Sequence, residues 1–263
     1  SGLNIAAIDL VAEDSSKPLL DQGGAIVEVN AGPSLLMHLK PAVGEPRPVG
    51  KSIVGHLFPE GQTGRIPIVG ITGSKGKTAV ARFLRHLTLL SGKYVALASS
   101  DGLFLDQRHV QKTDASHWAP ARRVLLNRAV ELAIFENGAR AILGEGLAYD
   151  RCQVGVVTNL DPEEQHLDYA IDDHEMLYKV FRTQVDVILK GGAAVLNAAD
   201  PQLVEMSELC DGEVIFFAAS DANPVVATHI GKGGRAVFAR REELILATGN
   251  TETRRARMAD VPT

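Results

Sequence analysis

The chain has 263 residues, of which 45% are hydrophobic and 22% are charged. Such values are typical of a globular protein and exclude a disordered or fibrous chain. The net charge of −5 provides no basic excess to neutralise a nucleic-acid backbone, so no nucleic-acid partner is expected. No apolar run approaches the roughly 18 residues that cross a bilayer, so no membrane partner is expected either.

Two cysteines, Cys152 and Cys210, are too few for a disulfide framework, and their spacing matches no zinc site. A cytoplasmic location is therefore expected. The chain begins with Ser1-Gly2-Leu3, without a methionine or a signal peptide. We expect this start to be a cloning remnant or a cut within a longer polypeptide.

Residues 1–60 differ from the rest of the chain. Apolar stretches at 5–11 and 25–29 predict two strands, and the pattern over 49–58 predicts a short helix. Sixty residues with two strands bury too little surface to be stable alone. We expect them to be the end of a preceding domain, joined to the next by the turn-rich residues 59–64.

From Arg65 onward, short apolar runs alternate with helical patterns, which predicts a doubly wound, mostly parallel α/β sheet in a domain over 61–263. The expected strands are 66–71, 94–98, 132–135, 154–157, 193–196 and 214–217, with a hairpin arm at 103–110. The expected helices are 78–90, 120–129, 172–189 and 201–209. After Asn223, extended pieces at 225–230, 236–239 and 243–247 predict a small β appendage.

The strongest local signal is the run Gly73-Ser74-Lys75-Gly76-Lys77-Thr78, between a predicted buried strand and a predicted helix. Glycines let backbone amides converge on phosphate oxygens, and a helix N-terminus adds positive potential. Lys77 can reach the terminal phosphates of ATP, and the Thr78 hydroxyl suits Mg²⁺. The alternative is a glycine-rich turn that binds no nucleotide.

This short loop, in this order of segments, resembles the central ATPase domain of the Mur ligase family. Further segments are similar to the cyanophycin synthetases, in which a Mur-type ligase follows an ATP-grasp ligase; they are residues 144–152, Val156-Val157-Thr158-Asn159, His166-Leu167-Asp168 and 194–201. Residues 28–33, 37–39 and 44–47 are similar to the last strand and exit of the ATP-grasp domain. The resemblance spans most of residues 1–220, and the chain stops at Val261-Pro262-Thr263, near where the family continues into the rest of its Mur half.

The resemblance implies an ATP- and Mg²⁺-dependent ligase that activates a carboxylate as an acyl phosphate, which an amine then attacks. In this family the ATP-grasp half adds aspartate to a polymer primer, and the Mur half adds arginine to the aspartate side chain. A homo-oligomer of the full-length protein is also implied.

The resemblance also assigns roles to individual residues. Lys77 would be catalytic, Thr78 and Glu136 would hold Mg²⁺, and His166 would bind a second metal. Asn159 and Asn197 would lie near nucleotide or substrate, and Lys179 near a position that is often carbamylated. In the ATP-grasp part, Glu28, Asn30 and Asp9 would be the metal ligands. Without the resemblance, six of them would more simply be turn, surface or packed residues: Glu28, Asn30, Asn159, His166, Lys179 and Asn197.

Three departures from the family pattern bear on function. An expected Ala-Arg-Gly-Gly run is absent after Glu136, His117 stands in a loop that has lost its glycines, and Ala199 replaces the first of two expected aspartates. One alternative is therefore a degenerate Mur-like module that only binds nucleotide or supports assembly. Another is an unrelated P-loop NTPase, although Glu136 favours a Mur-type site.

Overall fold

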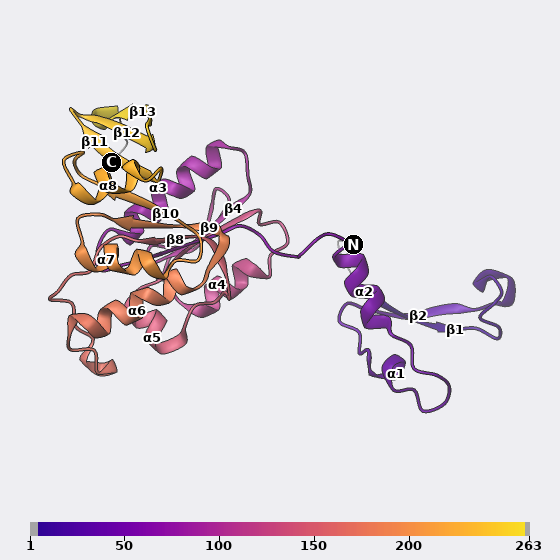
Figure 1. Cartoon of the computed structure of the whole chain (residues 1–263). Helices are drawn as coiled ribbons and strands as arrows, with labels where there is room; N and C mark the ends of the chain where they lie inside the picture. The colour runs from indigo at the N-terminus through magenta and orange to yellow at the C-terminus, as the bar shows by residue number, and fades with distance from the viewer. Residues whose placement is uncertain (1–4, 261–263) are drawn as a thin grey trace. The chain divides into compact units, whose positions relative to one another are not determined.

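The computed structural model of the chain describes residues 5–260, so the predictions about Ser1-Gly2-Leu3 and about 261–263 lie outside the described residues. Two compact units are present, the first ending at Arg65 and the second starting at Ile66 (Figure 1). No helix of the described chain is long and apolar enough to cross a bilayer.

The first unit is built around a two-stranded antiparallel hairpin and contains the strands and the helix predicted there. Its elements are β1 (Ala7–Val11), η1 (Leu19–Gln22), β2 (Ala25–Asn30), α1 (Leu36–Leu39) and α2 (Val49–Leu57). None of its described residues is buried, and apolar side chains such as Ile8, Val27 and Val29 are more than half exposed. Within its described residues, this unit therefore has no hydrophobic core of its own.

The second unit is organised on one sheet of eleven strands, in the order β13-β12-β11-β10-β9-β8-β3-β7-β4-β5-β6. The central strands from β11 to β4 run parallel, and antiparallel strands extend both edges. The strands are β3 (Ile68–Thr72), β4 (Val95–Ser99), β5 (Gly102–Leu105), β6 (Arg108–Gln111), β7 (Leu132–Glu136), β8 (Cys152–Val157), β9 (Ile188–Asn197), β10 (Glu213–Ala218), β11 (Arg235–Arg240), β12 (Glu243–Thr248) and β13 (Thr251–Arg257).

Helices cover both faces of this sheet, as a doubly wound fold requires (Figure 1). Alternate residues of β3 enter different cores: Ile68 belongs to one, and Val69 and Ile71 belong to the other. The helix α3 (Lys77–Leu90) packs on the second core through Ala81. The first core receives α4 (Trp118–Leu125), α5 (Ala139–Glu145), α6 (His174–Asp186), α7 (Pro201–Met206) and α8 (Pro224–Gly231). Short 3-10 turns complete the unit at η2 (Leu167–Tyr169), η3 (Ser207–Leu209) and η4 (Met258–Asp260).

The sheet contains the strands predicted before residue 223, although the arm predicted over 103–110 is two paired strands, β5 and β6. Other predictions in this unit were wrong or missing. Residues 225–230 are not extended; they form α8, because the Asn223 side chain caps the amides of Val225 and Val226. The strands after it are not a separate appendage, since β11 pairs in parallel with β10. The helix predicted over 172–189 ends at Asp186, and α5 was not predicted because glycines flank it at both ends.

The strand order places a topological switch point between β3 and β8. From β3 the chain passes over β7 to β4, whereas from β8 it moves to β9 on the opposite side. Connections that leave two neighbouring parallel strands in opposite directions open a crevice at the carboxyl ends of those strands, where α/β proteins bind ligands. The predicted phosphate loop follows β3, so it lies at this crevice.

The cap of α8 predicts a measurable loss of stability. Asn223→Ala removes the acceptor for two helix amides and should lower the free energy of unfolding by about 0.5–2 kcal/mol. Urea denaturation of the purified protein measures this change. Asn223→Asp keeps a capping oxygen and should retain most of the stability; equal midpoints for the alanine variant and the wild type would contradict the role of the cap.

Candidate nucleotide site

The phosphate loop is a tight connection between β3 and α3. Gly73 and Gly76 have φ angles of +120° and +84°, which side chains other than glycine rarely adopt. A Cβ atom on Gly73 would also lie 2.3 Å from the Thr158 hydroxyl oxygen. The two glycines are therefore required by the backbone path and, at Gly73, by the close approach of the chain after β8.

The loop after β8 holds the phosphate loop through a set of hydrogen bonds. Asn159 accepts from the Ser74 amide through its backbone carbonyl at 3.0 Å and from the Lys75 amide through Oδ1 at 3.0 Å. The Lys75 carbonyl accepts from Thr158 Oγ1 at 2.7 Å and from Asn159 Nδ2 at 3.0 Å. The Asp161 amide donates to Ser74 Oγ at 2.8 Å. The predicted ligands Ser74 and Lys75 thus direct their amides toward Asn159.

An ion pair adds to this contact. Lys75 Nζ lies 2.5 Å from Asp161 Oδ2. The hydrogen bond from Lys75 lowers the pKa of the Asp161 carboxyl, and the same hydrogen bond raises the pKa of the Lys75 ammonium group. Because the lysine side chain is largely exposed, this pair contributes little to stability by itself.

Lys77 and Thr78 stand at the first turn of α3, where they were predicted. Lys77 Nζ donates to the Ser74 carbonyl at 3.0 Å, so the ammonium group lies over the loop. Thr78 Oγ1 donates to Glu136 Oε1 at 2.9 Å. The structure therefore brings together two predicted metal ligands that are 58 residues apart in sequence.

The Glu136 carboxylate is buried at the end of β7, with 4% of its surface exposed. It accepts from the Ser100 amide at 3.1 Å and contacts the Ser100 hydroxyl at 3.3 Å. Ser100 was missed in the sequence, although it directly follows β4, the neighbour of β7. Carboxylate and hydroxyl oxygens together are the donors that Mg²⁺ prefers, so this group fits the metal.

A buried polar cluster packs against Gly70 of β3. Asn137 Nδ2 donates to the Tyr149 hydroxyl at 2.8 Å and to Gln184 Oε1 at 3.0 Å. The Tyr149 hydroxyl donates to the same Gln184 oxygen at 2.7 Å. Gln184 also donates to the Cys152 sulfur at 3.4 Å, and burial raises the pKa of that thiol to about 12. The cluster fixes Asn137, the residue next to Glu136.

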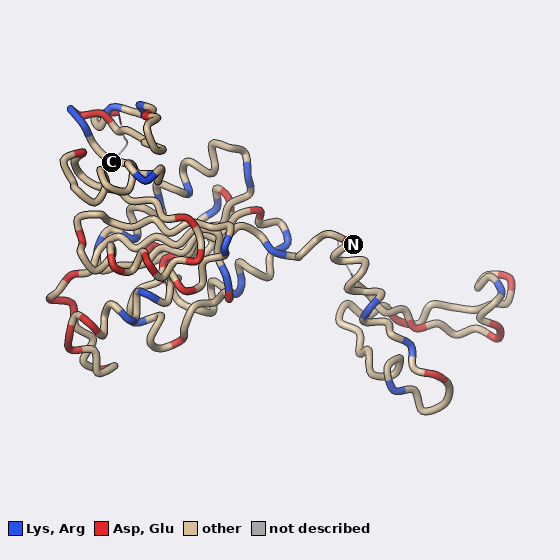
Figure 2. Tube along the Cα trace, viewed as in Figure 1, with Lys and Arg blue, Asp and Glu red and all other residues tan. Residues whose placement is uncertain are grey.

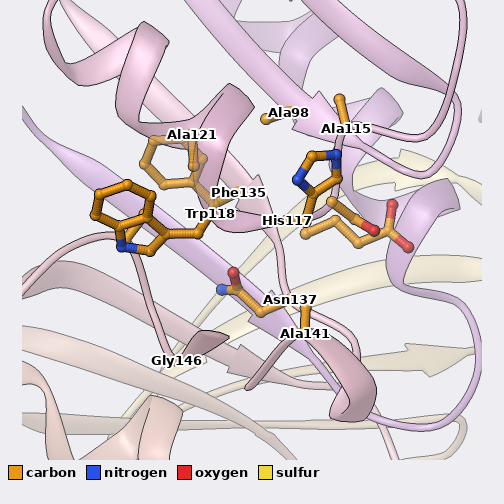
Figure 3. Close-up of a pocket in the computed structure, with 12 residues that line it drawn as sticks. Ala98, Ala115, His117, Trp118, Ala121, Phe135, Asn137, Ala141 and Gly146 are labelled. Atoms are coloured by element: carbon orange, nitrogen blue, oxygen red, sulfur yellow. The ribbon is translucent and has the colours of Figure 1, made fainter. Parts of the chain in front are cut away.

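A small pocket adjoins the Glu136 carboxylate on the side of α4 and α5. Five alanines, Phe135 and Trp118 line it together with polar residues. In the view of Figure 3, His117 and Trp118 lie above Asn137 and Ala141. The ring of Trp118 carries the Arg122 guanidinium at 5.2 Å from its centroid. The full lining is Ala98, Ala115, Ser116, His117, Trp118, Ala121, Phe135, Glu136, Asn137, Ala141, Gly146 and Ala148.

Other predicted residues of this unit lie in different surroundings. His166 Nε2 is paired with Glu164 Oε1 at 2.8 Å. Asn197 ends β9 and donates to the Thr158 carbonyl at 3.3 Å, so it supports the chain after β8. Lys179 is exposed on α6 and pairs with Glu175 at 2.9 Å. Among residues 5–260, no three His, Cys, Asp or Glu side chains gather in a geometry that would hold a metal.

In the first unit, the hairpin places the three predicted ligands of the ATP-grasp part close in register. Asp9 is directly opposite Glu28, and Ala7 is opposite Asn30. Glu28 and Asn30 are two residues apart on one strand, so their side chains share a face. Like charges directly opposite each other destabilise a hairpin unless a cation lies nearby.

Basic and acidic residues are interspersed along the second unit, as Figure 2 shows.

Comparison with known proteins identifies the family. The model of the Mur ligase middle domain matches residues 71–244, which include the phosphate loop, Glu136 and the loop after β8. The chain belongs to the Mur ligase middle-domain family. The match covers most of the second unit, so the predicted fold class, an α/β domain with a large, mostly parallel sheet, is confirmed.

The chain is similar in sequence to two cyanophycin synthetases. It is 37% identical over 262 residues to that of Geminocystis herdmanii and 40% identical over 234 residues to that of Synechocystis sp.. These alignments cover 99% and 89% of this chain, but only 30% and 27% of the respective relatives. The chain thus spans less than a third of the length of these relatives.

A solved structure supports the fold. A UDP-N-acetylmuramoyl-L-alanyl-D-glutamate–2,6-diaminopimelate ligase matches with a TM-score of 0.57 at 13% identity, over 78% of this chain and 41% of that chain. At this identity the likeness shows a common fold and nothing about the substrate.

The buried cluster predicts that a single methyl group added at Gly70 severely lowers the stability of the protein. A Cβ atom on Gly70 would lie 2.0 Å from the Tyr149 hydroxyl and 2.3 Å from Gln184 Oε1. Gly70→Ala should therefore lower the free energy of unfolding by about 2–4 kcal/mol, through overpacking and broken buried hydrogen bonds. A urea unfolding curve measures it.

The matched control is Gly191→Ala in β9, where an added Cβ atom meets nothing within 4 Å. It should change stability by less than about 0.5 kcal/mol. Equal effects of the two substitutions would show that the cluster does not depend on the space above Gly70.

Proposed function

We propose that this chain is the nucleotide-binding part of an ATP- and Mg²⁺-dependent ligase that joins a carboxylate to an amine. The observation that carries the proposal is the hydrogen bond between Thr78 and Glu136 at the N-terminus of α3. It gathers a phosphate loop, a lysine and a metal-binding pair of oxygens at one end of the sheet. The resemblance to ligases over nearly the whole chain supports this chemistry.

The groups of the chain have distinct tasks in this proposal. Lys77 leaves the Ser74 carbonyl and neutralises charge on the terminal phosphates. Thr78 and Glu136 hold Mg²⁺, which supplies further charge neutralisation when bound. A carboxylate oxygen of the substrate attacks the γ-phosphorus, the bond to ADP breaks, and an acyl phosphate forms. The amine then attacks the carbonyl carbon, phosphate leaves, and the nitrogen loses a proton.

The small pocket beside Glu136 is proposed to receive the carboxyl end of the acyl substrate. It shares the Glu136 wall with the metal pair, so a carboxylate placed there is close to the phosphate that it attacks. The pocket has room for about one water-sized group, such as a single carboxylate oxygen. His117 and Ser116 offer polar groups at the wall.

The activity of the whole protein is proposed from the cyanophycin synthetases. By that analogy, aspartate and arginine are the amino acids joined, a cyanophycin-like polymer is the primer, and a homo-oligomer in the cytoplasm is the working form. The first unit would be the end of an ATP-grasp domain covering residues 1–60, in which Asp9, Glu28 and Asn30 bind Mg²⁺. The lack of buried residues over 5–65 supports a place in a larger domain.

We also propose that His166 binds a second metal and that Asn197 contacts the nucleotide. His166 is part of the same loop after β8 that contacts the phosphate loop through Asp161. The altered loops at 113–120 and 137–141 do not disturb Thr78 and Glu136, so no observation favours a module that has lost catalysis.

Substitution of the loop lysine tests the proposed function. Lys77→Ala should reduce ATP-dependent phosphate release by roughly 10²–10³-fold, because the terminal phosphates lose their cation. The assay offers primer, aspartate and arginine to the full-length protein that contains this chain. Lys190→Ala, at an exposed position of β9, is the matched control and should leave the rate unchanged. Phosphate release that is absent with every carboxylate and amine pair offered would refute ligation.

Filling the pocket tests the proposed carboxylate site separately. Ala141→Leu should raise the KM for the carboxylate substrate roughly tenfold or more, since added carbon atoms occupy a confined site. The Kd for Mg-ATP, measured by calorimetry, should stay constant. Ala119→Leu, on the exposed side of α4, is the control. An unchanged KM in the Ala141→Leu variant would exclude the pocket as the carboxylate site.

A further inference from the structure

The loop after β8 contacts two consecutive peptide groups of the phosphate loop, and it holds them in opposite orientations. The peptide between Ser74 and Lys75 points its N–H group at Asn159 Oδ1. The peptide between Lys75 and Gly76 points its carbonyl at Thr158 Oγ1 and Asn159 Nδ2. A side-chain amide and a hydroxyl thus determine the orientation of both peptides.

Because the peptide bonds are trans, these contacts also determine which groups face the other side of the loop. The C=O and N–H groups of one trans peptide point in opposite directions. Since the Ser74–Lys75 peptide directs its N–H toward Asn159, its carbonyl faces the interior of the loop, where it accepts from Lys77 Nζ at 3.0 Å. By the same rule, the N–H group of Gly76 faces that interior, because the Lys75 carbonyl is held outside.

The interior-facing N–H group of Gly76 precedes the first turn of α3, where amides bind phosphate. A flip of the Lys75–Gly76 peptide would replace this donor by a carbonyl oxygen and repel the anion. Nothing in the glycine backbone itself prevents such a flip. The Thr158 hydroxyl and the Asn159 side-chain amide oppose this flip. Thr158 is buried, with 6% of its surface exposed.

We propose that Thr158 and Asn159 are positioning residues of the nucleotide site: they lock the Lys75–Gly76 peptide with its carbonyl outward and so direct the Gly76 amide at the phosphates. They act through the loop and touch no phosphate themselves. Gly73 fits this lock, because a side chain there would displace the Thr158 hydroxyl. The inference rests on the proposed nucleotide-binding function of the loop.

The experiment compares Thr158→Val with Thr158→Ser in the purified protein. Valine keeps the volume and loses the hydroxyl, so the Kd for Mg-ATP, measured by calorimetry, should rise roughly five- to tenfold, as expected for one lost hydrogen bond. Serine keeps the hydroxyl and should bind Mg-ATP within about twofold of the wild type. Asn159→Ala provides a second variant and should weaken binding at least as much, since it removes two hydrogen bonds.

Thr88→Val is the matched control, because Thr88 Oγ1 donates to the Leu84 carbonyl at 2.8 Å within α3, away from the loop. It should change stability but leave the Kd unchanged, which separates positioning from a general loss of stability. Urea midpoints of all variants are measured alongside. Wild-type affinity in both Thr158→Val and Asn159→Ala would overturn the lock. A wild-type protein that does not bind Mg-ATP would instead overturn the proposed function.

Discussion

The hydrogen bond between the Thr78 hydroxyl and the buried Glu136 carboxylate is the interaction on which the site depends. A carboxylate with so little exposure is stable only when donors or a cation surround it. Thr78 and Ser100 supply the donors, and both come from strands or helices adjacent to β7. The parallel order β3-β7-β4 therefore makes the site, because it aligns the ends of three strands on one edge.

Two sets of contacts hold the residues around this carboxylate in place. The buried cluster of Asn137, Tyr149 and Gln184 fixes the chain immediately after Glu136 and explains why residue 70 is glycine. The loop after β8 fixes the phosphate loop in the same way, through its backbone. Both supports use buried or half-buried polar groups that are hydrogen-bonded to one another, and such networks rigidify a site. The site is thereby held in place before any ligand arrives.

Much of this arrangement could be predicted from the sequence, and the parts that could not have physical reasons. The glycine, lysine and threonine pattern identifies the phosphate loop because its spacing follows from backbone geometry. Glu136 was found because it ends an apolar strand and matches a glutamate of the family it resembles. Ser100 was missed because a serine after a strand is common in turns. The roles of Thr158 and Asn159 depend on contacts with residues more than 80 positions away, which local patterns do not contain.

The helix α8 shows a different limit. Valine-rich residues favour strands, but Asn223 and Pro224 start a helix, and the local cap outweighed the preference of the side chains. The first unit shows another limit of prediction from sequence, because its hairpin exposes apolar residues on both faces. Its sequence predicts the elements and not the surface that covers them.

The most direct test of the account is a crystal structure of the protein with Mg²⁺ and a non-hydrolysable ATP analogue. The account predicts a triphosphate on the amides of residues 76–78, Lys77 released from Ser74, and a metal between Thr78 and Glu136. A phosphate loop that stays empty at saturating nucleotide, with Lys77 still bound to the Ser74 carbonyl, would contradict it.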